Sequence, residues 1–305
     1  MVSNIKKCFI FSLIACILFA NLYSIIDYMA SGEMEIFLTP SIYNKFTYYG
    51  LTRVFKDWHP TYVSLFLNLG LVFAYDLYFK NKRYILWGLI TALSSLNIFL
   101  LNSFIGIIVF LLIFYLFILQ ILNGSRKALI ASTFIMLCLM SIFYIRNPFH
   151  YPKIEKFKHT EFKITDKKDE RNALNLRLAK WKTSIDVFKN APILGVSNGD
   201  YKNALYDQYV KNEFFYCAGE RYSSHNQYLY TLSANGTIGL ILLILILYLP
   251  FTQKARNYVF LLFLAICSIF FITEDLLARQ QGVVFFIFFY VFLSHPIGIN
   301  STNEK

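Results

Sequence analysis

The chain has 305 residues, of which 57% are hydrophobic, 19% aromatic and only 15% charged. A soluble domain carries about 25% charged residues, so this composition excludes a soluble globular domain, a disordered chain and a coiled coil. The formal net charge of +11 would suit nucleic acid, but many of the basic residues flank apolar runs, a pattern typical of membrane proteins. We therefore expect an all-α, polytopic membrane protein.

Eight apolar runs predict the transmembrane helices, because a helix needs roughly 17–25 residues to cross the hydrocarbon core of a bilayer. In chain order they are residues 8–26, 62–79, 84–101, 103–122, 128–145, 228–251, 258–273 and 281–294. The first run follows Lys6 and Lys7 and is longer than a usual signal core, so it is interpreted as a signal anchor. The last two runs are short and need flanking residues or a thin bilayer.

Basic residues in the short connections predict the orientation of these helices. One side of the membrane is expected to carry nine: Lys6, Lys7, Lys80, Lys82, Arg83, Arg126, Lys127, Lys254 and Arg256. The other side is expected to carry four: Lys45, Arg53, Lys56 and Arg279. Because cytoplasmic loops are enriched in Lys and Arg, both termini are expected in the cytoplasm and the loop between residues 146 and 225 outside, which in a bacterium is the periplasm and makes the membrane the inner one.

The chain divides into three predicted segments: five transmembrane helices in residues 1–145, one large periplasmic loop in residues 146–225, and three transmembrane helices in residues 226–305. The loop holds 15 Lys and Arg against 10 Asp and Glu. It is too long for its charges to count in the positive-inside rule. Its cations are expected to face lipid headgroups or an anionic substrate, beyond the reach of cytosolic nucleic acid. Its cysteine, Cys217, is a candidate for labelling from outside if the thiol is exposed.

An amphipathic helix is expected within the loop. Apolar residues recur there at spacings of 4, 3, 4 and 3: Leu174, Leu178, Trp181, Ile185 and Phe188. This period is that of one face of an α-helix, and residues 192–199, rich in Gly and Pro, end it. A basic amphipathic helix beside a membrane is expected to lie in the plane of the interface.

Candidate reactive side chains gather at the predicted external ends of the helices: Arg53, His59, Arg177, Arg221, His225, Glu274 and Asp275. The membrane interior offers no central charged residue, although a proton-coupled transporter would be expected to carry one. The candidates also have structural interpretations. His59 and His225 precede helices and could act as N-caps, and Arg177 could lie along the membrane surface beside Trp181.

The order of the motifs is more specific than any single residue. Along the chain it reads Arg177-x-x-x-Trp181, Pro192-Ile193-Leu194-Gly195, Ser224-His225-Asn226-Gln227 and Asn235-Gly236-Thr237-Ile238-Gly239. Earlier stand Arg53 and Trp58-His59-Pro60-Thr61, and later Glu274 with Gln280-Gln281-Gly282. This arrangement resembles the O-antigen ligase and O-antigen polymerase family of bacterial envelope enzymes over residues 50–295, most specifically from residue 177 to residue 240.

Two features depart from the family pattern. Its members usually carry Ser-Arg-Gly at a turn where this chain reads Asn102-Ser103-Phe104, so a basic contact is missing or replaced. The chain also has eight predicted crossings where relatives commonly have ten or more.

The resemblance implies transfer of a glycan from an undecaprenyl-diphosphate carrier to an acceptor hydroxyl, which belongs to lipid A core for ligases and to another repeat unit for polymerases. Such a reaction needs cations for the diphosphate and a base for the hydroxyl. Arg177, Arg53 and Arg221 would bind phosphate, Glu274 would contact substrate, and His225 would be the base, with inversion at the anomeric carbon. No Asp-x-Asp motif occurs at a membrane-facing loop, so neither a divalent metal nor another cofactor is expected.

Three alternatives stay open. Polymerase and ligase share one domain, and the small size and the turn at residues 102–104 favour a polymerase only weakly. A non-enzymatic transporter of envelope polysaccharide or lipid would need charged or helix-breaking residues at mid-membrane depth in several spans, and these are scarce. A membrane scaffold would leave the Arg and His residues at the helix mouths unexplained.

Overall fold

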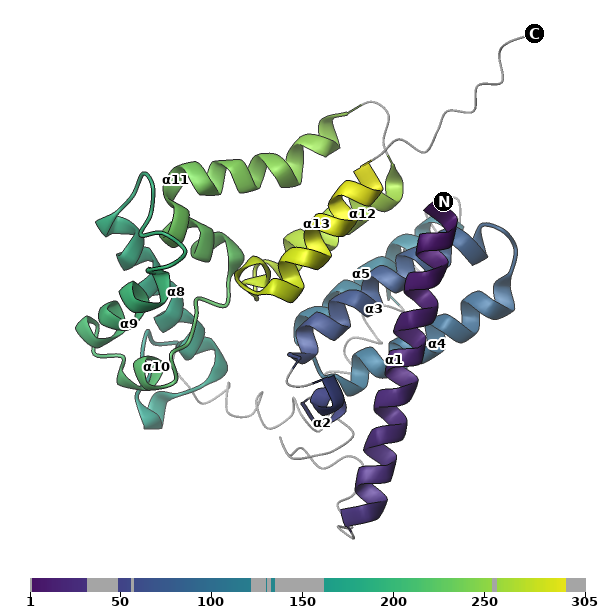
Figure 1. Ribbon diagram of the computed structural model, residues 1–305, viewed down its shortest axis with the longest axis horizontal. Coiled ribbons are helices and arrows are strands. Elements are labelled where there is room, and N and C mark those ends of the chain that lie inside the picture. Colours follow the sequence, from purple (N-terminus) through teal and green to yellow (C-terminus); the bar gives the residue numbers. More distant parts are fainter. Residues whose placement is uncertain are drawn as a thin grey trace. The chain divides into compact units, whose positions relative to one another are not determined.

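The structure is a computed structural model that describes residues 2–31, 49–55, 58–121, 130, 133–134, 162–253 and 257–294. Over these ranges the chain is helical and contains no strand (Figure 1). It forms two compact units, unit 1 (residues 1–155) and unit 2 (residues 156–305). The all-α architecture expected from composition is therefore confirmed for the part of the chain described.

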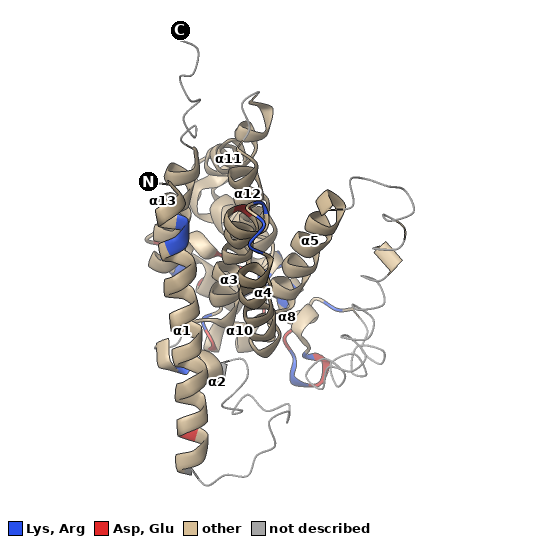
Figure 2. Ribbon diagram, turned by 90° about the vertical axis from the view of Figure 1, so that its right-hand side faces the viewer, with Lys and Arg blue, Asp and Glu red and all other residues tan. Residues whose placement is uncertain are grey.

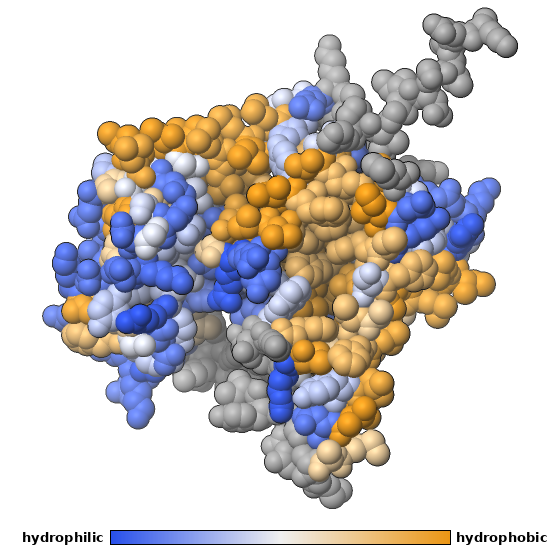
Figure 3. All heavy atoms as spheres, in the orientation of Figure 1, coloured by the Kyte–Doolittle hydropathy of each residue, from blue (hydrophilic) through white to orange (hydrophobic). Residues whose placement is uncertain are grey.

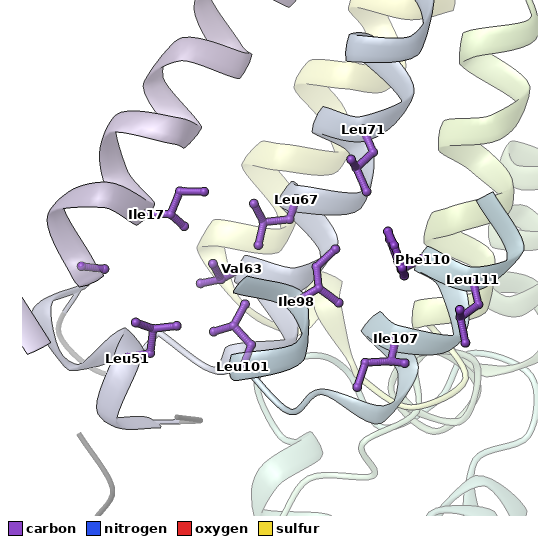
Figure 4. Packing of buried hydrophobic residues seen from close by; sticks show 11 residues of the cluster. Ile17, Leu51, Val63, Leu67, Leu71, Ile98, Leu101, Ile107, Phe110 and Leu111 are labelled. Carbon is purple, nitrogen blue, oxygen red and sulfur yellow. The ribbon is translucent and has the colours of Figure 1, made fainter. Parts of the chain in front are cut away.

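Unit 1 is built around one buried helix. Its elements are α1 (Val2–Ser31), α2 (Tyr49–Thr52), η1 (Arg53–Phe55), α3 (Pro60–Ala74), the π-helical turn η2 (Tyr75–Phe79), α4 (Tyr84–Leu100) and α5 (Phe104–Ile121). Nearly every residue of α3 is buried, and α3 packs against α1, α4 and α5. Apolar side chains from these helices meet in one cluster that includes Ile17, Leu67, Ile98 and Phe110 (Figure 4).

The start of α3 has the structural features of a capped helix. His59 is its N-cap, and its Nδ1 atom accepts a hydrogen bond from the backbone N–H of Thr61 at 3.3 Å. Pro60 follows at the first helical position, where its missing N–H costs nothing. The capping interpretation of His59 is therefore confirmed.

The turn that departs from the family pattern also starts a helix. Ser103 Oγ accepts from the backbone N–H of Gly106 at 3.3 Å, which caps the first turn of α5. Ser103 Oγ also donates to Thr61 Oγ1 at 3.4 Å, so the turn is tied to the beginning of α3. Asn102 adopts a φ of 50°, a left-handed conformation that Asn tolerates well. Hydrogen bonds from polar side chains therefore hold this turn.

Ion pairs show which residues lie at the same end of unit 1. Lys6 Nζ lies 2.7 Å from Asp76 Oδ2, and Lys80 Nζ lies 2.9 Å from Asp76 Oδ1. Arg53 Nη1 lies 3.4 Å from Asp27 Oδ2, near the other end of α1, and Figure 2 shows these charges at opposite ends of that helix. Lys6 and Lys80, which the sequence predicts on the same side of the membrane, therefore lie at the same end of unit 1.

Unit 2 combines a cluster of polar helices with apolar ones. Its elements are η3 (Lys168–Glu170), α8 (Ala173–Asn190), α9 (Tyr201–Lys211), α10 (Phe215–Gly219), α11 (Gln227–Tyr248), η4 (Leu249–Thr252), α12 (Tyr258–Phe270), η5 (Leu276–Ala278) and α13 (Gln280–Ser294). α8 packs against α9 and α11 (Figure 1). Their shared core includes Ala179, Tyr201, Tyr209, Cys217 and Ala234.

Four helical segments are long and apolar enough to cross a membrane: Val2–Ala30, Pro60–Phe79, Phe104–Ile121 and Gln227–Thr252. Three further apolar helices are shorter, with 17 residues in α4, 13 in α12 and 15 in α13. Each lies where a span was predicted. The predicted span at residues 128–145 lies almost wholly outside the described residues. The apolar side of α11 is exposed, as expected of a surface that faces lipid (Figure 3).

The predicted amphipathic helix is present as α8. The side chains that it buries are mostly small or polar: Asn175, Ala179, Lys180, Thr183, Ser184 and Val187. The apolar stripe of Leu174, Leu178, Trp181, Ile185 and Phe188 is at most partly buried, and Ile185 is 40% exposed. Small side chains allow close packing on α11, where Ser233 Oγ donates to the carbonyl oxygen of Ser184 at 2.7 Å. The stripe is thus only partly buried, and the core of unit 2 is packed mainly against the small and polar side of α8.

The turn after α8 is bound to a break in α11. Ser197 N donates to the carbonyl oxygen of Ala234 at 2.8 Å, and Thr237 N donates to that of Pro192 at 2.9 Å. The helical path of α11 is interrupted at Gly236, with φ 66° and ψ −167°. These bonds satisfy backbone groups that the break would otherwise leave unpaired.

Two glycines permit this close approach. Gly195 and Gly236 have φ of 71° and 66°, in the region that favours glycine. A Cβ atom on Gly195 would collide with the backbone of Ala234, and one on Gly236 would collide with the carbonyl of Ile193. The Pro-Gly turn and the Asn-Gly step are therefore two halves of one joint between α8 and α11.

Candidate active site

His225 lies in the turn that leads into α11. The N-cap of α11 is the next residue, Asn226, whose side-chain oxygen accepts from Leu229 N at 3.1 Å. His225 itself has a φ of 47°, an uncommon conformation for a residue other than glycine. The interpretation of His225 as an N-cap is therefore wrong, because the cap is already supplied and the imidazole points elsewhere.

Helix α9 stabilises this turn through Tyr201. The hydroxyl oxygen of the buried Tyr201 accepts from Ser224 N at 3.3 Å, and Ser224 Oγ donates to the carbonyl oxygen of Asn226 at 3.0 Å. Burial raises the pKa of Tyr201 to about 12, so its hydroxyl stays protonated. These contacts fix the backbone on both sides of His225.

Gln227 joins this turn to the segment between α12 and α13. Its backbone N–H donates to the carbonyl oxygen of Phe271 at 2.8 Å, and its Oε1 accepts from Leu277 N at 2.7 Å. The two bonds bracket Glu274 and Asp275, which are thereby held beside His225 although they follow it by about fifty residues.

His225, Glu274 and Asp275 form a compact cluster. His225 Nδ1 lies 3.5 Å from Glu274 Oε2, and one ligand-type atom of each of the three residues lies within 4.8 Å of the others. Both carboxylates are buried, with Glu274 7% exposed and Asp275 3% exposed, while the imidazole is half-buried. A nitrogen and two carboxylates could bind a divalent cation. The same arrangement can instead orient the imidazole as a base, with a carboxylate at Nδ1 and Nε2 available to substrate.

Lys180 and Arg177 bring positive charge to this site from α8. Lys180 is 7% exposed, and its Nζ lies 4.9 Å from the centroid of the Tyr222 ring. That ring lies 6.1 Å, centroid to centroid, from the His225 ring. Burial, and then the nearby charge of Arg177, lower the pKa of Lys180 to about 8, opposed in part by Cys217 and by the carboxylates of Glu274 and Asp275.

The five predicted site residues have different positions. The structure brings His225 and Glu274 together, and Arg177 lies one turn before Lys180 on α8. Arg221 is exposed at a φ of 50°, with its guanidinium 5.7 Å from the centroid of the Tyr206 ring on α9. Arg53 belongs to unit 1, where it pairs with Asp27.

The sequence singled out Asp275 beside Glu274, and Gln227 within the Ser224-His225-Asn226-Gln227 motif. It missed three residues that build the site: Lys180, Tyr201 and Tyr222. A signal existed for one of them. Lys180 follows Arg177 by three residues on a helix, and such a pair shares a face. The others act through backbone hydrogen bonds or ring contacts that no spacing in the sequence indicates.

The suggested labelling of Cys217 also needs correction. The Cys217 thiol is fully buried in the core of unit 2, and burial with the nearby Asp166 carboxylate raises its pKa to about 12. A thiolate is the species that reacts with labelling reagents. This cysteine is therefore unsuited to testing orientation.

The fold and site define an integral membrane protein with a polar site at the mouth of an apolar helix. The O-antigen ligase family model matches residues 89–244, just over half of the 305 residues, and the chain belongs to that family. The matched range contains Arg177, Lys180 and His225. No curated protein matches the sequence. Family membership implies a membrane glycosyltransferase of the O-antigen ligase or polymerase type that acts on lipid-linked glycans.

Proposed function

We propose that the chain is a metal-independent, inverting glycosyltransferase at the periplasmic face of the bacterial inner membrane. It moves a glycan from undecaprenyl diphosphate to the hydroxyl of an acceptor, either a further glycan or lipid A core. The observation that carries this proposal is the contact between His225 and Glu274 at the mouth of α11, with Arg177 and Lys180 supplying positive charge from α8.

The proposed step uses the groups of the site as follows. The imidazole of His225, with its Nδ1 proton toward Glu274, accepts the acceptor's hydroxyl proton at Nε2. The acceptor oxygen bonds to the anomeric carbon as the bond from that carbon to the phosphate oxygen breaks. The diphosphate leaves with the bonding electrons, and cations stabilise its charge. His225 then releases its proton to water.

Arg177 is the proposed diphosphate clamp. Its side chain is half-exposed and makes no ion pair with any residue that the structure describes, so its planar fork remains available for phosphate. Arg221 is proposed as a further phosphate contact, and Glu274 as both a partner of His225 and a contact for substrate. The assignment of Arg53, in unit 1, to phosphate stays a prediction from the sequence.

Transfer by purified protein tests the proposal. We expect the protein, given undecaprenyl-diphosphate-linked glycan and acceptor, to form product equally with and without EDTA. Loss of product on adding EDTA, with recovery on adding a divalent cation, would assign the cluster of His225, Glu274 and Asp275 to a metal instead. No product under either condition, with substrate bound, would favour a transporter.

Arg177→Lys tests the clamp. A lysine keeps the charge but cannot make two parallel hydrogen bonds to phosphate, so we expect transfer to fall by about 10-fold or more. Lys182→Arg is the matched control, because Lys182 is exposed on α8 and pairs with Asp186 at 2.6 Å. Full activity in the Arg177→Lys protein would show that the paired hydrogen bonds of Arg177 to phosphate are not required.

Polymerase and ligase activities differ in the acceptor, and we propose polymerase. Deletion of the gene is then expected to remove only the long-chain ladder of envelope polysaccharide on a gel. Loss of all glycan joined to the core would identify a ligase.

A further inference from the structure

Unit 2 contains a deeply buried cation, Lys180, whose side chain is only 7% exposed. Among the residues that the structure describes, its ammonium makes no hydrogen bond and no ion pair, although the carboxylates of Glu274 and Asp275 are near enough to oppose the lowering of its pKa. Its contact is with the face of the Tyr222 ring at 4.9 Å. A buried charge is costly unless it is paired, so this arrangement calls for an explanation.

A structural role does not supply that explanation. Neighbouring positions buried on the same face of α8 carry small side chains, such as Ala179, Thr183 and Ser184, which allow close packing on α11. An apolar side chain of the same length would fill the space of Lys180 without the cost of desolvation. The cation–π contact recovers only about 0.5–2 kcal/mol.

The charges of the site are divided between two elements. α8 supplies the cations Arg177 and Lys180, which lie three residues apart on one face. The segment between α12 and α13 supplies the carboxylates Glu274 and Asp275, which lie beside His225. The Tyr222 ring lies against both Lys180 and His225. An anion is therefore expected on the α8 side and a neutral hydroxyl on the side of the carboxylates.

We propose that Lys180 binds the diphosphate of the lipid carrier, as a second cation beside Arg177. This inference rests on the proposed function, because it takes the anion to be the leaving group of glycosyl transfer. Lys180 contributes a point charge within a desolvated wall, and Arg177 contributes the directional fork at its exposed edge. In the complex the ammonium gains a directly contacting anion, which no residue that the structure describes provides.

Binding of a defined probe tests the assignment. The affinity of the purified protein for undecaprenyl diphosphate is measured in lipid nanodiscs, with undecaprenol as the uncharged comparison. Three proteins are compared: wild type, Lys180→Met and Lys182→Met. We expect Lys180→Met to bind undecaprenyl diphosphate about 10- to 100-fold more weakly, as for the loss of a charged hydrogen bond. Lys182→Met is expected to bind as wild type, because Lys182 is exposed and paired with Asp186.

Each other outcome contradicts the inference in a distinct way. Wild-type affinity in Lys180→Met would overturn it and leave the proposed function standing, provided that wild type still transfers glycan. Equal losses in both variants would show general attraction to a basic surface. A lower melting temperature in Lys180→Met would show a structural role instead. Failure of wild type to prefer undecaprenyl diphosphate over undecaprenol would overturn the inference and the proposed function together.

Discussion

At the start of α11, the residues next to His225 each have a separate structural role. Asn226 caps the helix, Gln227 binds the turn between α12 and α13, and Ser224 is held by Tyr201. With the structural tasks supplied by its neighbours, His225 is left with a half-buried imidazole beside Glu274. A residue held in a left-handed conformation by such contacts is typical of a functional site, where strain is tolerated for position.

The burial of Lys180 predicts a measurable dependence of stability on pH. The pKa of Lys180 is about 8 in the folded protein against an ordinary value of 10.5. Between these values the unfolded chain binds more protons than the folded one, so stability contributed by this site rises with pH. Below pH 8 the charged side chain costs on the order of 3 kcal/mol. Lys180→Met is therefore expected to raise the melting temperature at pH 7 in the absence of ligand.

The rise in melting temperature of Lys180→Met over wild type is expected to shrink as the pH is raised from 7 to 9.5, because Lys180 of the wild type then loses its charge. Differential scanning calorimetry of the wild type and Lys180→Met at the two pH values measures this difference. A gain that is the same at both pH values would show that desolvation of the ammonium is not its cause.

At the scale of elements, the joint between α8 and α11 positions the site. The Gly195 turn binds the break at Gly236, and the two cations of α8 are carried on a helix that this joint fixes. The family motifs at these glycines therefore have a packing explanation, and the chemistry lies in residues that flank them.

Gly236→Ala tests the joint. The new Cβ would collide with the carbonyl of Ile193 and would also be strained at a φ of 66°, so we expect a loss of about 1–3 kcal/mol in stability and reduced transfer. Gly219→Ala is the matched control, because a Cβ there meets no atom within 4 Å. The melting temperatures of the two variants measure this loss. If Gly236→Ala is as stable as Gly219→Ala, the close approach of the two backbones is not required.

The sequence predicted different parts of the fold to different depths. Hydrophobic periodicity located α8, and apolar run length located the helices of both units, since these depend on local composition. The sequence pattern could not show that α8 buries its small and polar side chains and not its apolar stripe, because which side is buried depends on the fit to α11. Likewise, His225 and Glu274 were each candidates, but their contact depends on Gln227, whose two hydrogen bonds join segments distant in the chain.

At the scale of the whole molecule, orientation in the membrane is the largest open prediction. Because Cys217 is buried, we choose Asn203→Cys on the exposed surface of α9 and Asn81→Cys in the exposed turn between η2 and α4. An impermeant thiol reagent is expected to label the first in intact spheroplasts and the second only after permeabilisation. The opposite pattern would reverse the orientation and remove the site from the periplasm.

The central claim, that His225 is the general base, is tested most directly by His225→Asn. Asn adopts left-handed backbone conformations readily, so the turn at a φ of 47° should be preserved, but the side chain cannot accept a proton. We predict that the variant keeps its melting temperature and its affinity for undecaprenyl diphosphate while turnover falls by about 10²–10⁴-fold. His59→Asn, which replaces one N-cap by another in unit 1, is predicted to stay active. A folded His225→Asn protein that transfers glycan at the wild-type rate would contradict the account.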